Sequence, residues 1–169
     1  LNDTLMLAAA GGMDLAQAGD MMTNTVSQFG LKATDAGRVA NVLAAGASAT
    51  NTSVSELGAG MGQVGALAHT FGMSLEETTA ALGQLSNMGL KGAEGGTALR
   101  GVLGSLASVS GPAKDAVEAL GLSMDDINPA THSLSEIFGA LRSHGMTAAD
   151  AIKIFGREGA SAAGPHEPP

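Results

Sequence analysis

The chain contains no cysteine, no tryptophan and no tyrosine, and phenylalanine occurs only four times in its 169 residues. Without cysteine, disulfide bonds, cysteine zinc sites and thiol catalysis are excluded. Without large aromatic side chains, the core has to be built from Leu, Met and Val with close contacts between helices. The length suits one domain that buries roughly two-thirds of the surface of its unfolded chain.

Positive charge is also scarce, since eight Lys and Arg oppose sixteen Asp and Glu for a formal net charge of −8. Nucleic-acid surfaces need clustered cations to contact phosphates, so no nucleic-acid site is predicted. No apolar run approaches the roughly 18 residues that span a membrane. The first residues, LNDTLMLAAAGG, lack an initiator Met and a basic leader. They do not resemble a signal peptide, and we expect Leu1 to fall inside a longer polypeptide.

Glycine, in contrast, is abundant, with 25 residues and no Gly-X-Y period. Four of these glycines are followed by Leu or Met and then by Ser or Thr within three residues: Gly30, Gly72, Gly121 and Gly145. Gly89 is followed by Leu90 and has the first half of this pattern. A glycine in the left-handed conformation followed by an apolar residue is typical of helix ends. The unequal intervals do not support a repeat of fixed period.

Apolar residues recur at steps of three or four along most of the chain, which predicts helices. Their inward faces are expected to include Leu15, Met88 and Ile152, and Thr34 is expected to cap a helix. Three pairs have the S-x-x-E spacing of a capping box: Ser53 with Glu56, Ser74 with Glu77, and Ser133 with Glu136. The sequence therefore predicts an all-α, single compact domain of about eight short helices, with orthogonal or bundle-like packing and no disulfides.

The stretch from Ser74 to Arg100 has the strongest local pattern. A helix is predicted to begin at about Leu75 and to end at Gly89. The glycine-rich segment from Gly92 to Gly96 is expected to be a link, after which a second helix starts. This stretch is therefore predicted to form a helical hairpin with an unusual corner.

Two glycine-rich segments match the letters of nucleotide-binding motifs without their structural context. The segment GMGQVG, at 60–65, lies inside a helix-period pattern, whereas a dinucleotide fingerprint follows a strand. A spacing of four for Gly58, Gly62 and Ala66 instead predicts close approach of another helix. The segment GLKGAEGGT, at 89–97, lacks the GK[ST] ending of a phosphate loop.

Candidate catalytic and metal-ligating residues show no recognisable spacing. The four histidines are far apart and form no H-x-x-x-H or H-E-x-x-H motif. No serine has a neighbouring His and acid, although distant parts of a chain can assemble a triad. We predict no catalytic, cofactor or metal site and no enzymatic activity.

Four sequence segments carry a resemblance to a known family: LAAAGGMDLAQAGDMMTNTVSQFGL, TDAGRVANVLAAGASATNTSVSELG, GLKGAEGGTALRGVL and IFGRE. Through them the chain, from Leu5 to about Glu158, resembles the central domain of bacteriophage tail tape measure proteins of the minor tail protein family. The most diagnostic motif of the family is a Gly-hydrophobic-Lys-Gly corner followed by Gly-Thr-Ala-Leu-Arg. The resemblance implies a structural or interaction corner made by Gly89, Lys91, Gly92, Gly96, Thr97 and Arg100.

The resemblance also implies a domain organisation and a role. Residues 1–158 would form a tape-measure-like helical domain that lacks the upstream helices of the family, and residues 159–169 a disordered tail. Its role would be structural, in tail assembly, length determination and genome ejection, inside the virion tail lumen or tip and in the bacterial cytoplasm during assembly. Expected partners are other tape measure copies, tail tube, tail-tip or baseplate proteins and tail assembly chaperones. Two alternatives are a membrane-active helical segment that contacts the host membrane and a tail-associated peptidoglycan hydrolase.

Overall fold

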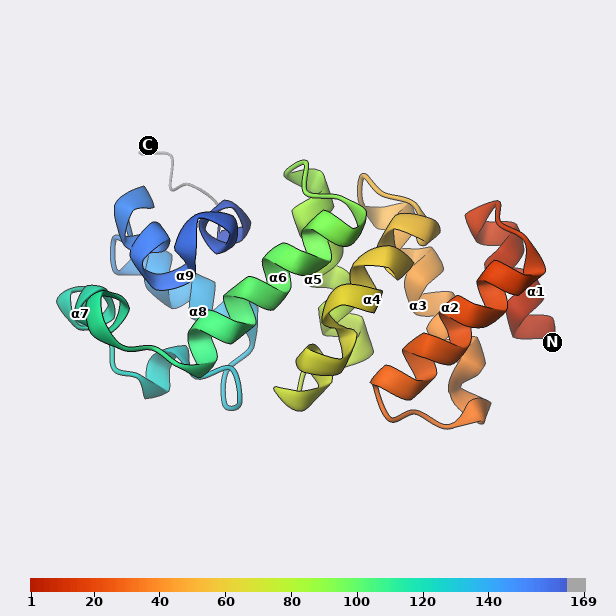
Figure 1. Cartoon of the computed structure of the whole chain (residues 1–169), viewed down its shortest axis with the longest axis horizontal. Coiled ribbons are helices and arrows are strands. Elements are labelled where there is room, and N and C mark those ends of the chain that lie inside the picture. Colours follow the sequence, from red (N-terminus) through yellow and green to blue (C-terminus); the bar gives the residue numbers. More distant parts are fainter. Residues whose placement is uncertain (164–169) are drawn as a thin grey trace. The chain divides into compact units, whose positions relative to one another are not determined.

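The computed structural model describes residues 1–163, and these are all-α, as predicted (Figure 1). The described residues form nine α-helices, two short 3₁₀ helices and no strand. One helix, at the start of the chain, was not anticipated among the about eight expected. Where the sequence suggested one compact domain, the contacts group the chain into two compact units, Leu1–Thr97 and the residues from Ala98 onward.

The first unit consists of five α-helices, a 3₁₀ helix and the start of a sixth α-helix. Their bounds are α1 (Asn2–Gly11), α2 (Leu15–Gln28), η1 (Ala33–Asp35), α3 (Ala36–Ala49), α4 (Val54–Thr70), α5 (Leu75–Asn87) and α6 (Gly92–Ala107). Helix α1 packs against α2, α3 and α4, and α5 packs against both α3 and α4. The core contains Leu7, Leu43, Leu57, Met61, Val64 and Leu75, each at most 1% exposed. Phe29, at 4% exposed, is also part of this core, which otherwise consists mainly of aliphatic side chains and Met.

The second unit contains the rest of α6 and three more α-helices. These are α7 (Gly111–Ala119), α8 (Leu134–Ser143) and α9 (Ala148–Ala163), with the 3₁₀ helix η2 (Asp125–Ile127) between α7 and α8. Helix α7 packs against α9, and η2 packs against α8. Gly156, with φ 73° and ψ 176°, interrupts α9, and helical geometry resumes behind it up to Ala163. The predicted tail thus overlaps α9 at 159–163, and its remaining residues lie outside those described.

Five helix ends have the glycine closure that the sequence predicted. Gly30, Gly72, Gly89, Gly121 and Gly145 all have positive φ, between 60° and 93°. The residue after each donates its backbone N–H to a carbonyl five residues earlier, for example Met146 to Leu141 at 3.0 Å. In this Schellman arrangement the apolar residue folds back onto the helix that it ends, and Met146 is accordingly only 2% exposed.

All three predicted capping boxes are confirmed. In each, the serine hydroxyl accepts the backbone N–H of the glutamate, and the carboxylate accepts the backbone N–H of the serine: Ser53 with Glu56, Ser74 with Glu77, and Ser133 with Glu136. Ser123 with Asp126 and Thr147 with Asp150 repeat the arrangement with aspartate. The predicted cap at Thr34 is wrong, because this residue lies inside η1 and the Asp35 carboxylate instead accepts the N–H of Lys32.

Hydrogen bonds in four of these caps lower carboxyl pKa values. At Glu136, the backbone N–H of Ser133 and then its hydroxyl hold the pKa below its ordinary value of 4.5. For Asp126 and Asp150 the lowering of the pKa also comes first from the backbone N–H of the capping residue and then from its hydroxyl. For Glu56 the main cause is the hydrogen bond from the Thr52 hydroxyl. Because the folded pKa values are depressed, this stabilisation is complete above the unfolded pKa. It is lost as the pH falls through the folded values.

We expect Glu136→Gln to keep most of the stability at pH 7 while weakening its dependence on pH. A glutamine oxygen still accepts the N–H of Ser133, but it does not titrate. Urea unfolding at pH 7 and at pH 3 measures the difference between the two conditions. The wild type should lose more of its free energy of unfolding than the variant between these pH values. Equal losses would contradict the assignment of part of the acid sensitivity to this cap.

Three predicted inward positions are exposed instead. Leu15 is 42% exposed, and Met88 and Ile152 are each 47% exposed. Leu15 and Met88 lie at helix ends, beyond the region where neighbouring helices cover the apolar face. The buried hydrophobic residues in the described part of α9 include Ala151, Ile154 and Phe155, so Ile152 lies outside the buried face.

Candidate functional site

The corner between α5 and α6 is formed by two glycines in the left-handed conformation. Gly89 has φ 93° and ends α5, and the N–H of Leu90 bonds to the carbonyl of Leu85 at 2.9 Å, as predicted. Gly92 has φ 59° and begins α6. The chain therefore changes direction between these two residues with only Leu90 and Lys91 between them.

The glycine-rich segment after this turn is helical, so the predicted link from Gly92 to Gly96 is wrong. Glycine disfavours a helix by about 1 kcal/mol relative to alanine, which explains the prediction. In the structure Gly95 and Gly96 are both buried, and their close packing offsets this cost. A Cβ on Gly95 would lie 2.6 Å from the carbonyl oxygen of Leu90, closer than side-chain carbons come to other atoms.

Helices α4 and α6 make backbone contact at Gly60 and Gly96. A Cβ on Gly96 would overlap the carbonyl oxygen of Gly60 and lie 2.8 Å from the Cβ of Gln63. A Cβ on Gly60 would in turn lie 2.9 Å from the carbonyl oxygen of Gly92 and 3.1 Å from Leu82. The start of α6 is therefore held against α4 by a contact that no other residue type permits without movement of the backbone.

The prediction that Gly58, Gly62 and Ala66 mediate close helix contact is largely wrong. Gly62 and Ala66 are exposed, and a Cβ on Gly62 would meet open space. Gly58 does lie against a neighbour, but the contact is with the flexible side chain of Met21. The close backbone contact is at Gly60 because the buried face of α4 runs through Leu57, Gly60, Met61 and Val64. The GMGQVG segment does lie inside a helix, as expected.

Polar groups join this corner to the start of α4. The side-chain oxygen of Asn87 accepts the backbone N–H of Asn51 at 2.8 Å. The Glu56 carboxylate accepts the hydroxyl of Thr52 and the N–H of Ser53, both at 3.0 Å, and these bonds lower its pKa. The charge of Lys91 makes a smaller contribution in the same direction. The capping box of α4 and the predicted corner are thus neighbours in space.

The six predicted corner residues divide into two sets. Gly96 is buried and Lys91 and Gly92 are half-buried, whereas Gly89, Thr97 and Arg100 are exposed. Backbone geometry at the corner depends on the glycines, while Thr97 and Arg100 present their side chains to solvent. The sequence reasoning missed Gly60 and Gly95 as parts of the corner. A usable signal existed for Gly60, which lies between apolar residues on the predicted inner face of its helix.

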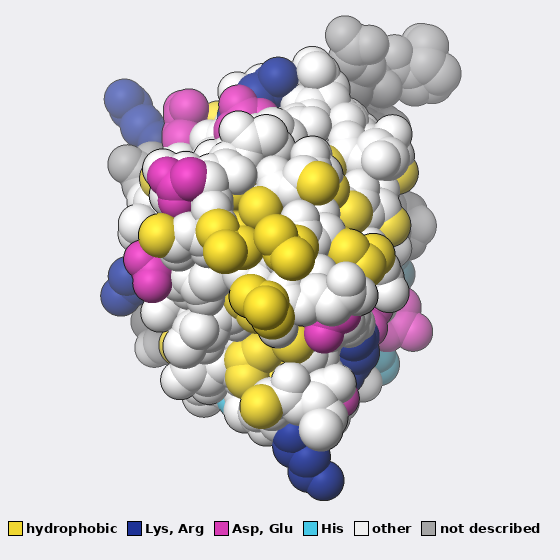
Figure 2. Space-filling model, turned by 90° about the vertical axis from the view of Figure 1, so that its right-hand side faces the viewer, with side chains coloured by type: hydrophobic (Ala, Val, Ile, Leu, Met, Phe, Trp, Pro, Cys, Tyr) yellow, Lys and Arg dark blue, Asp and Glu magenta, His cyan; other side chains and the backbone are white. Residues whose placement is uncertain are grey.

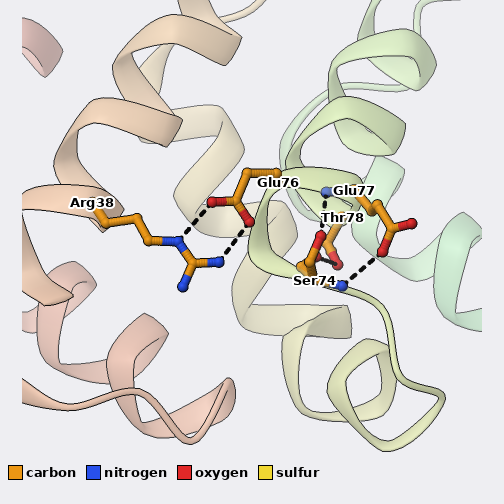
Figure 3. Close-up of polar contacts among 5 residues, drawn as sticks. All are labelled: Arg38, Ser74, Glu76, Glu77 and Thr78. Atoms are coloured by element: carbon orange, nitrogen blue, oxygen red, sulfur yellow. Dashed lines mark hydrogen bonds and ion pairs between the residues drawn. The ribbon is translucent and has the colours of Figure 1, made fainter.

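A bidentate ion pair links the first turn of α5 to α3 (Figure 3). The Arg38 guanidinium donates Nε to Oε1 of Glu76 at 2.6 Å and Nη2 to Oε2 at 2.7 Å. This pairing lowers the pKa of Glu76 and raises that of Arg38. Both side chains are nearly half exposed, at 44% and 48%, so screening by solvent keeps the contribution of the pair to stability small. The 38-residue separation gave no sequence signal for it.

The same turn of α5 provides a direct test of a cap (Figure 3). The Ser74 hydroxyl accepts the N–H of Glu77 at 3.1 Å, and its carbonyl accepts the hydroxyl of the buried Thr78 at 2.8 Å. We expect Ser74→Ala to lower the free energy of unfolding by about 1 kcal/mol, because the N–H of Glu77 loses its acceptor. Denaturant unfolding measures this, with Ser55→Ala at an exposed position of α4 as the control. Equal effects of the two substitutions would contradict it.

Residues 1–163 contain neither a metal-binding cluster nor a membrane-spanning helix. No group of three or more His, Cys, Asp or Glu side chains in this part of the chain is arranged to hold a metal ion. None of the described helices combines the length and the apolar character needed to cross a bilayer.

Comparison with known proteins gives two matches over most of the chain. The family model of the phage-related minor tail protein matches residues 1–157. A tape measure protein of Pneumococcus phage Dp-1 is 38% identical over 138 residues, which are 82% of this chain and 12% of the relative. No solved structure is significantly similar. The names of the family and the relative point to a structural tail protein and not to an enzyme. The chain belongs to the phage-related minor tail protein family.

Proposed function

We propose that the chain is a structural segment of a phage tail tape measure protein, acting in tail assembly and length determination and in genome ejection. The observation that carries this proposal is the 38% identity to a tape measure protein over most of the chain. The chain spans about an eighth of the length of that relative. Length measurement would therefore depend on the whole polypeptide, and this segment would contribute contacts.

The structure suggests how such contacts could be made. The backbone contact between Gly60 and Gly96 fixes the start of α6 on α4, so that Thr97, the next residue of the helix, is held in a defined position in the first unit. Thr97 and Arg100 are exposed on this helix. A guanidinium on a rigid element suits recognition of acidic or carbonyl groups on another protein. We propose partners among other tape measure copies, tail tube, tail-tip or baseplate proteins and tail assembly chaperones.

The proposed location is the virion tail, in its lumen or tip, with the bacterial cytoplasm as the place of assembly. Two assays separate the alternative functions from this one. Clearing of a peptidoglycan gel would assign the chain as a hydrolase, and leakage from lipid vesicles would assign a membrane-active segment. The structural proposal expects neither result.

A direct test uses the phage or prophage that encodes the chain. We expect Arg100→Glu to reduce the number of complete tails seen by electron microscopy, because it reverses the charge of the exposed corner. Lys153→Glu, an exposed charge reversal on α9, is the matched control and should leave tails unchanged. Circular dichroism of the isolated variants establishes that both fold. Normal tails with Arg100→Glu, and also with the destabilising substitution Gly96→Ala, would overturn the proposal.

A further inference from the structure

We draw no further inference here: the strongest candidate, the apolar patch that includes Leu5 and Met6 on the exposed side of α1 (Figure 2), carries none because nothing in the structure shows what covers it.

Discussion

Gly96→Ala should lower the free energy of unfolding by about 2 kcal/mol, because the added methyl group overlaps the carbonyl oxygen of Gly60. Helix propensity predicts the opposite sign, since alanine in place of a helical glycine stabilises by up to about 1 kcal/mol. The clash should win because the groups that would have to move are backbone atoms of two packed helices. Thermal unfolding followed by circular dichroism should show a decrease in Tm of about 5 °C or more.

Gly62→Ala is the matched control for this experiment. Gly62 lies two residues from the contact, in the same helix, and a Cβ there would meet open space. With no clash, helix propensity alone should act and the variant should be slightly more stable than the wild type. A Gly96→Ala variant as stable as Gly62→Ala would contradict the close contact between α4 and α6.

Helix ends could be predicted from the sequence because their determinants are local. A capping box such as Ser74 with Glu77 needs only two residues three positions apart. A glycine closure such as Gly145 followed by Met146 also depends on a few neighbouring residues. These interactions form wherever the helix itself forms, so the structure has all three predicted boxes and all five closures.

Features that depend on tertiary packing could not be predicted in the same way. The sequence predicts a link at Gly96 because the intrinsic propensity of glycine opposes a helix, whereas the close contact with Gly60 explains why glycine is needed in the helix there. The ion pair of Arg38 with Glu76 joins residues that are close only after α3 packs against α5. The wrong prediction of the contact face on α4 has the same origin, because the spacing of small residues alone does not say which side of a helix another helix contacts.

The candidate corner combines both kinds of determinant. Its turn at Gly89 follows from local sequence, whereas its position beside Glu56 and Gly60 follows from packing. The resemblance to tape measure proteins implies that this segment is an interaction corner, and the structure shows which of its residues are buried and which are exposed. In the first unit, the glycine packing lies on one side of the start of α6 and Thr97 is exposed.

Gly89→Val should lower the free energy of unfolding by about 2 kcal/mol or more, because a β-branched residue is strained at positive φ. Gly89 has φ 93°, and a Cβ there would touch nothing within 4 Å, so the effect isolates backbone strain from steric overlap. Gly89→Asn is the control, since asparagine adopts the left-handed conformation more readily and should lose clearly less stability. Thermal unfolding should place the melting temperatures in the order glycine, asparagine, valine. An unchanged melting temperature for the valine variant would show that the end of α5 does not depend on this closure. The turn that directs the chain from α5 into α6 would then need another physical explanation.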